Sequence, residues 1–137
     1  NDDIDKFINE LTKSKIKNIK LPVSAPFHCP LMSPATKIMN KELFNTNFSR
    51  PNNMIVSNVT SLPSNDPETL RDLLIEQIEK PVRWRESIIN MINLGNKRFI
   101  EIGPGKVLSG LVKRIDRNVE LTQVNNINDL SNLKIND

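Results

Sequence analysis

A single histidine is the first candidate for chemistry in this sequence. His28 is the only histidine among the 137 residues, and it lies in the loop Pro26-Phe27-His28-Cys29-Pro30. An imidazole exchanges protons near neutral pH and can therefore act as a general base. The two prolines fix the backbone at both ends of the loop and would hold the ring in place. A lone histidine is more often structural or exposed, but this loop follows a predicted strand, where α/β sheets present catalytic groups. His28 is therefore a candidate base.

A nucleophile to accompany this base is harder to find. Cys29 is adjacent to His28, but neighbouring side chains usually point apart, so a small buried hydrophobic residue is the preferred interpretation. The four glycines do not bracket a serine at the spacing of a G-x-S-x-G nucleophile elbow. The sequence thus contains a possible base without an obvious nucleophile.

The segment Gly103-Pro104-Gly105-Lys106 follows a predicted strand and opens a predicted helix. Helix N-termini bind anions, which suggests a phosphate loop. The Walker pattern G-x-x-x-x-G-K-[ST] is absent, because Val107 follows the lysine and Ile100 stands where the pattern needs its first glycine. A plain tight turn is the preferred interpretation.

The predicted helix 106–117 has a basic side. At ~100° per residue, Lys106, Lys113 and Arg117 fall within about 20° of one line, opposite the apolar residues. Such a stripe is either an ordinary solvated face or a surface for an acidic protein or a phosphate.

Composition limits the class of protein. The mass of 15.6 kDa, with 37% hydrophobic and 26% charged residues, fits one globular domain. No apolar run approaches the roughly 20 residues of a membrane span. One cysteine and one histidine can form neither a disulfide nor a zinc cage. The 4% aromatic content argues against base stacking on nucleic acid, and the net charge of +3 only weakly favours an acidic partner.

Hydrophobic periodicity, caps and turn residues predict alternating elements. Helices are expected at about 2–11, 33–43, 67–80, 84–94 and 106–117, and strands at 19–25, 54–58, 98–102 and 119–124, with a short weak helix after them. Ser33-Pro34 and Asp66-Pro67 each read as an N-cap followed by proline at the first helical position. The alternation predicts an α/β fold with a largely parallel sheet.

Four segments together resemble one enzyme family. Residues 23–32, VSAPFHCPLM, look like the catalytic-histidine segment of malonyl-CoA:acyl-carrier-protein transacylases. SNVT at 57–60, EQIEKPVRW at 76–84 and EIGPGKVLSGL at 101–111 follow in the order of that family. One such segment would be weak evidence, but four in order, covering roughly residues 20 to 117, are specific.

The resemblance implies a larger fold than this chain. Members of the family have an α/β-hydrolase-like large subdomain with a small ferredoxin-like subdomain inserted. Residues 1–20 would be the end of the small subdomain, and residues 21–137 the C-terminal part of the large one. The nucleophilic serine, the oxyanion hole and the arginine that holds the malonyl carboxylate would lie upstream. The chain starts Asn1-Asp2-Asp3, without methionine or signal-peptide features, which leaves a processed protein or a fragment as the two options. The resemblance implies the fragment, and because the serine elbow is absent from it, the fragment is expected to be inactive alone.

The resemblance also assigns roles to residues. His28 matches the general base, and Gln77 matches the residue whose backbone carbonyl accepts a hydrogen bond from its ring. Asn58 matches a position near the active site, where a substrate-binding role is expected. Phe27, directly before His28, resembles members that select malonyl units. The turn at 103–105 matches a structural strand-to-helix turn.

The implied reaction is malonyl transfer from malonyl-CoA to the phosphopantetheine thiol of acyl carrier protein, in fatty acid biosynthesis, by a ping-pong Ser–His mechanism. No bound cofactor or metal, no nucleic acid and no membrane is implied, and a cytoplasmic monomer is expected. Lys106, Lys113 and Arg117 are predicted to dock the acidic carrier. Two alternatives remain: an acyltransferase domain of a polyketide synthase, and a non-catalytic phosphate- or nucleic-acid-binding module that uses the Gly103–Lys106 turn and the basic helix.

Overall fold

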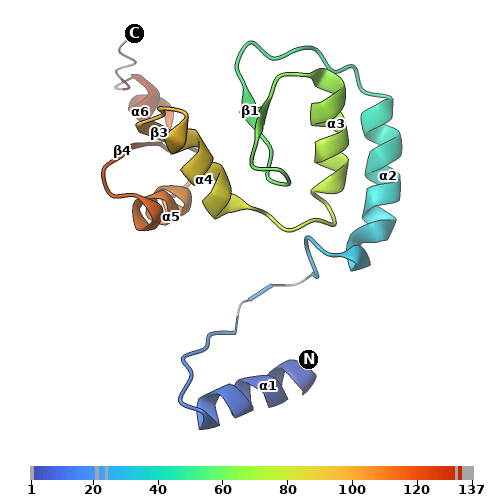
Figure 1. Cartoon of the computed structure of the whole chain (residues 1–137), viewed down its shortest axis with the longest axis vertical. Helices are drawn as coiled ribbons and strands as arrows, with labels where there is room; N and C mark the ends of the chain where they lie inside the picture. The colour runs from blue at the N-terminus through green and yellow to red at the C-terminus, as the bar shows by residue number, and fades with distance from the viewer. Residues whose placement is uncertain (1, 21, 24, 132, 134–137) are drawn as a thin grey trace.

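A computed structural model describes residues 2–20, 22–23, 25–131 and 133, and it contains both helices and strands (Figure 1). The first described element is α1 (Asp2–Lys13), which lies apart from the other elements. The remaining elements form two groups. The first contains the 3₁₀ helix η1 (Pro30–Met32), α2 (Ser33–Phe44), β1 (Ile55–Val56), β2 (Pro63–Ser64) and α3 (Pro67–Glu76). The second contains α4 (Trp84–Asn93), β3 (Arg98–Ile102), α5 (Val107–Ile115), β4 (Glu120–Val124) and α6 (Ile127–Ser131).

In the first group, α2 packs beside α3, and a short hairpin lies next to them (Figure 1). β1 pairs antiparallel with β2, with Val56 opposite Pro63. The predicted strand at 54–58 is thus confirmed in part, while β2 was not predicted and the pairing is not parallel. The reason is the short connection at 57–62, which can reverse the chain but is far too short for the crossover that a parallel pair needs.

Of the two helix starts predicted from a capping residue followed by proline, one is confirmed and the other is shifted by one residue. The Asp66 side chain caps α3 as predicted, accepting from the Thr69 backbone nitrogen at 2.9 Å and its hydroxyl at 2.6 Å. The bond to the Thr69 hydroxyl, followed by the bond to its backbone, holds the pKa of Asp66 below its ordinary value. Ser33, by contrast, is the first residue of α2, and Met32 occupies the N-cap position without a side-chain hydrogen bond. The proline signal was therefore right to within one residue.

The second group contains a parallel strand pair. β3 pairs with β4 from Arg98 opposite Glu120 to Ile102 opposite Val124, and α5 packs against both strands. β3 has the predicted bounds, and Gly95 follows α4 with a φ of 95°, as its predicted role as a helix stop requires. α5 ends at Ile115, earlier than predicted, because the backbone of Asp116 is extended.

The predicted strand at 19–25 is wrong for the residues that can be described. Residues 19, 20, 22, 23 and 25 have no strand structure, while positions 21 and 24 lie outside the described residues. Ile19 is 76% exposed and Val23 68% exposed. A strand exists only when another strand pairs with it, and none of the described strands lies against this segment. The α/β class is confirmed, but the described strands form two two-stranded sheets instead of one parallel sheet.

The core of the chain is small. Among the described residues, the buried hydrophobic side chains are Leu70, Ile88, Val112 and Val124. Large apolar side chains such as Leu31 and Ile102 are more than 70% exposed. Within the described part of the chain, no helix is long and apolar enough to cross a membrane.

Candidate active site

The ring of His28 is held by one short hydrogen bond. Its Nδ1 lies 2.7 Å from the backbone oxygen of Gln77. A carbonyl oxygen can only accept, so Nδ1 must carry the proton. In the neutral ring Nε2 is then the unprotonated nitrogen, the one able to take a proton from another group. The side chain is exposed, so that nitrogen is accessible.

The backbone of His28 also has an uncommon conformation. Its φ angle is 59°, in the left-handed region that only a few per cent of non-glycine residues adopt, histidine more often than most. The loop between Pro26 and Pro30 thus turns sharply at this residue, with the Phe27 nitrogen bonded to the Ala25 oxygen at 2.9 Å. Backbone strain of this kind persists where the surroundings fix the conformation, and it is common at functional sites.

Gln77 is placed by the end of a helix. It is the C-cap of α3, and its nitrogen donates to the Leu73 oxygen at 3.1 Å. The last carbonyl groups of a helix lack intrahelical partners and form the negative end of the helix dipole. The Gln77 carbonyl uses this freedom to accept from His28. It fixes the tautomer of the ring, which is what a carboxylate does in a Ser-His-Asp triad.

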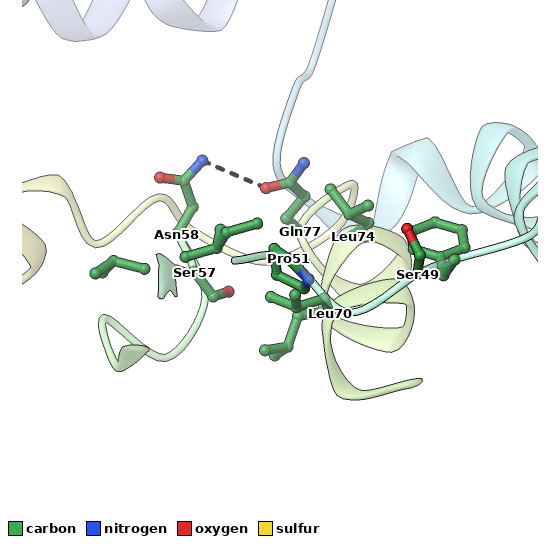
Figure 2. Close-up of a pocket in the computed structure, with 11 residues that line it drawn as sticks. Ser49, Pro51, Ser57, Asn58, Leu70, Leu74 and Gln77 are labelled. Atoms are coloured by element: carbon green, nitrogen blue, oxygen red, sulfur yellow. Dashed lines mark hydrogen bonds between the residues drawn. The ribbon is translucent and has the colours of Figure 1, made fainter. Parts of the chain in front are cut away.

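Asn58 joins this pair through the Gln77 side chain. Its Nδ2 donates to Gln77 Oε1 at 3.3 Å, as Figure 2 shows. Both residues line a cavity of about 390 Å³ between the hairpin and α3, and its other walls are mainly apolar. These walls are formed by Phe48, Ser49, Pro51, Ile55, Val56, Ser57, Leu70, Leu73 and Leu74. His28, Gln77 and Asn58 are therefore brought together, as the sequence motifs indicated.

The other predicted residues of this region lie differently. Phe27 is 58% exposed and is not among the residues that line the cavity, so its role in selecting the acyl group stays a prediction. Cys29 is half-buried, and its thiol donates to the Pro26 oxygen at 3.1 Å. This contact agrees with a structural cysteine. No cluster of three or more His, Cys, Asp or Glu side chains able to hold a metal ion occurs in the described ranges.

A carboxylate of this chain already accepts hydrogen bonds at the helix N-terminus that follows the Gly103–Lys106 turn. Glu101, at the end of β3, accepts from the backbone nitrogens of Leu108 and Ser109 at 3.0 and 2.8 Å. Hydrogen bonds from the side chain and backbone of Ser109 hold the pKa of Glu101 below its ordinary value. The Gly105 nitrogen is also engaged, by Asn125 Oδ1 at 2.6 Å. A phosphate at this helix N-terminus would meet a carboxylate and occupied amides, so the structural interpretation of the turn is favoured.

The basic residues form a different set from the predicted stripe. Lys113 and Arg117 line one open hollow together with Gly110 and Arg114. Lys106 is the N-cap of α5 and does not line this hollow. Arg114 was missed, although its spacing of three from Arg117 on a predicted helix could have indicated it.

No family model matches the chain. It is 42% identical over 97 residues to the malonyl CoA-acyl carrier protein transacylase of Salmonella typhimurium, a match that covers 71% of this chain and 31% of that protein. The crystal structure of the acyl-carrier-protein S-malonyltransferase from Bartonella henselae superimposes with a TM-score of 0.85 at 35% identity, covering 94% of this chain and 41% of that one. A malonyl-transacylase in complex with a type II PKS acyl-carrier protein gives a TM-score of 0.80 at 34% identity, covering 90% and 40%.

These matches confirm the resemblance that the four sequence segments indicated. The chain spans about a third of the length of the curated relative and about two fifths of the solved chains. The matched part is the C-terminal portion of these proteins.

Proposed function

We propose that this chain is the C-terminal part of a malonyl-CoA:acyl-carrier-protein transacylase and supplies its general base. The observation that carries the proposal is the 2.7 Å bond between His28 Nδ1 and the Gln77 backbone oxygen. This bond leaves Nε2 of an exposed imidazole as the proton acceptor. The similarity to transacylases over 71% of the chain supports malonyl transfer as the reaction that such a base would serve.

The proposed reaction has two half-reactions at one serine, which the resemblance places upstream of this chain. His28 Nε2 takes the serine proton as the serine oxygen attacks the malonyl thioester carbonyl, and the imidazolium then protonates the departing CoA thiolate. In the second half, His28 takes the proton of the carrier's phosphopantetheine thiol. That sulfur attacks the malonyl-serine ester, and the serine oxygen recovers its proton from the ring. The Gln77 carbonyl keeps Nδ1–H oriented throughout.

Other parts of the proposal rest on the resemblance. Residues 1–20 would end a small ferredoxin-like subdomain, which agrees with the separate position of α1 in Figure 1. Residues 21–137 would form part of the large subdomain. Phe27 would favour malonyl over branched units. The enzyme would work in the cytoplasm as a monomer, without a bound cofactor.

The proposed partner is an acidic acyl carrier protein. Its docking surface would include the hollow formed by Gly110, Lys113, Arg114 and Arg117, where three cations gather on α5 and just after it. A cationic rim speeds the encounter with an anionic partner and makes it depend on salt. A related malonyl-transacylase has been solved with an acyl-carrier protein, which supports this choice of partner.

The first test is genetic and needs no protein. The DNA upstream of Asn1 should continue the reading frame and encode a G-H-S-x-G elbow. A start codon near residue 1 would favour the alternative, a binding module that uses the turn and the basic helix. The carboxylate of Glu101 beside that turn already argues against this alternative.

The second test is kinetic and uses the complete enzyme. His28→Ala should lower the transfer rate by about 10²- to 10⁴-fold, the usual effect of losing a general base. Cys29→Ala is the matched control, because its thiol faces the Pro26 oxygen, and it should leave the rate nearly unchanged. Formation of malonyl-carrier from malonyl-CoA is the measurement. A His28→Ala enzyme that keeps most of its activity would contradict the proposal, and a large loss in Cys29→Ala would point to the thiol.

A further inference from the structure

We propose that Asn58 is a positioning residue for His28, acting through Gln77, and not a ligand of the substrate. The inference rests on the proposed function and goes beyond it, because it gives Asn58 a positioning role in place of the substrate-binding role that the resemblance implied. Three hydrogen bonds carry it: one to the Asn58 backbone, one from its side chain to Gln77, and one from the His28 ring to Gln77.

The backbone of Asn58 belongs to a rigid turn between β1 and β2. Ser61 in this turn is 1% exposed and has a φ of 62°. Its nitrogen donates to the Ser57 oxygen at 2.9 Å, and its oxygen accepts from Asn90 Nδ2 at 3.0 Å. A buried left-handed serine is kept in place only when its neighbours fix it. The turn is therefore a well-defined platform for Asn58.

The same turn is tied to the start of α4. The Arg83 backbone nitrogen donates to the Asn58 oxygen at 2.9 Å, and the Arg83 oxygen accepts from the Ser61 hydroxyl at 3.3 Å. Arg83 is the N-cap of α4. These bonds connect the hairpin of the first group of elements to the first helix of the second, so Asn58 is anchored from both sides.

The side chain of Asn58 extends this anchor to the catalytic pair. Nδ2 donates to Gln77 Oε1 at 3.3 Å, and Figure 2 shows the two amides facing each other along this hydrogen bond. Gln77 is the C-cap directly after α3, and helix ends fray unless other contacts hold them. Fixing the Gln77 side chain restrains the torsions of the residue whose carbonyl orients His28. Asn58 thus helps to fix the orientation of the His28 ring through two successive hydrogen bonds, from Asn58 to Gln77 and from His28 to Gln77.

A double-mutant cycle in the complete enzyme tests this coupling. Asn58→Ala and Gln77→Ala should each lower kcat by about 3- to 10-fold, the effect of one lost hydrogen bond, and leave the KM for malonyl-CoA unchanged. The double variant should be no slower than the worse single variant, because both changes break the same bond. Gln77→Glu keeps an acceptor oxygen for Asn58 and should keep most of kcat. Asn53→Ala, an exposed asparagine on the same segment, is the matched control and should have no effect.

A second measurement is independent of activity. Nitrogen NMR of the His28 ring should show the Nδ1–H tautomer in the unaltered protein and a larger share of the Nε2–H tautomer in Asn58→Ala. The inference would be overturned by additive losses of kcat in the double variant or by an unchanged kcat in Asn58→Ala. A raised KM for malonyl-CoA with unchanged kcat in Asn58→Ala would also overturn it and would make Asn58 a substrate ligand. If Asn58→Ala does not fold, Gln77→Ala breaks the same bond from the other side, and its kcat and tautomer decide. An unaltered enzyme without transacylase activity would instead refute the proposed function, and the ring spectrum would still report the coupling.

Discussion

This chain, produced alone, is expected neither to fold cooperatively nor to transfer malonyl groups. Its total accessible surface is 10904 Å² for a mass of 15.6 kDa. A folded monomer of this mass exposes about 7,200 Å². The excess of roughly 3,700 Å² exceeds what one partner contributes to most stable protein interfaces. The chain therefore exposes surface that a stable protein of this size would cover.

Large apolar side chains on helices and strands contribute to this surface. Ile100 and Ile102 of β3 are 38% and 77% exposed, although strands of parallel sheets are usually buried on both faces. Phe7 of α1 is 63% exposed, on a helix that stands apart in Figure 1. These exposed apolar faces agree with the fact that the chain matches only about a third of the length of the Salmonella protein. We expect upstream residues of the same protein to cover these faces.

The assay compares the chain alone with the protein extended by its upstream reading frame. For the chain alone, urea titration followed by the fluorescence of Trp84, its only tryptophan, should give a shallow transition, and a dye that binds apolar surface should bind strongly. Malonyl-carrier formation should stay at background. A sharp transition, with the m value of about 1–3 kcal/mol per molar urea usual for small folded proteins, would refute the reasoning from surface area. The extended protein should melt cooperatively.

Two further predictions concern charge. Reversing Lys113 and Arg117 to Glu in the complete enzyme should raise the KM for the carrier and flatten its salt dependence, while the KM for malonyl-CoA stays unchanged. The control Lys106→Glu, which lies outside the hollow, should have a smaller effect on the carrier KM. Kinetics at two salt concentrations test this, and an unchanged carrier KM in the double reversal would mean that the hollow is not part of the docking surface. The bonds from the Thr69 hydroxyl and backbone hold the pKa of Asp66 below its ordinary value, so its carboxylate stabilises the fold at neutral pH, and this contribution is lost as the pH falls through the folded-state pKa. In the complete enzyme, Asp66→Ala should therefore lower the Tm at pH 7 and lower it progressively less as the pH falls into the acid range. Calorimetry showing the same deficit across this range would contradict the assignment.

Local signals in the sequence were sufficient where the structure is decided locally. Asp66-Pro67 supplies a cap oxygen and a preset φ angle, and the helix starts there. Gly95 tolerates the positive φ that follows α4, and β3 has the bounds predicted for it. The bond between His28 and the Gln77 oxygen was also anticipated, but only from the resemblance, because no local pattern connects residues 49 positions apart.

Pairing between distant segments could not be predicted in this way. The segment 19–25 has the composition of a strand, yet a strand depends on a partner that sequence periodicity does not reveal. β2 contains Pro63, which argues against a strand interior, and it forms because the turn at 57–62 brings it beside β1. The contact between Asn58 and Gln77 likewise depends on where two loops meet. Each of these features is set by tertiary structure.

The two ends of α5 show why a motif alone is a weak guide to binding. At the N-terminus, the glycine-rich turn looks like an anion site, but Glu101 fills it from within the fold. At the C-terminus, Lys113 and Arg114 lie in the last turn, where cations also stabilise the helix dipole. Arg117 lies beyond the helix and still lines the same hollow, so helix stabilisation does not account for its position. The cations that converge on one open surface are therefore the better candidates for contact with an acidic partner, and the turn with the more suggestive sequence serves the fold.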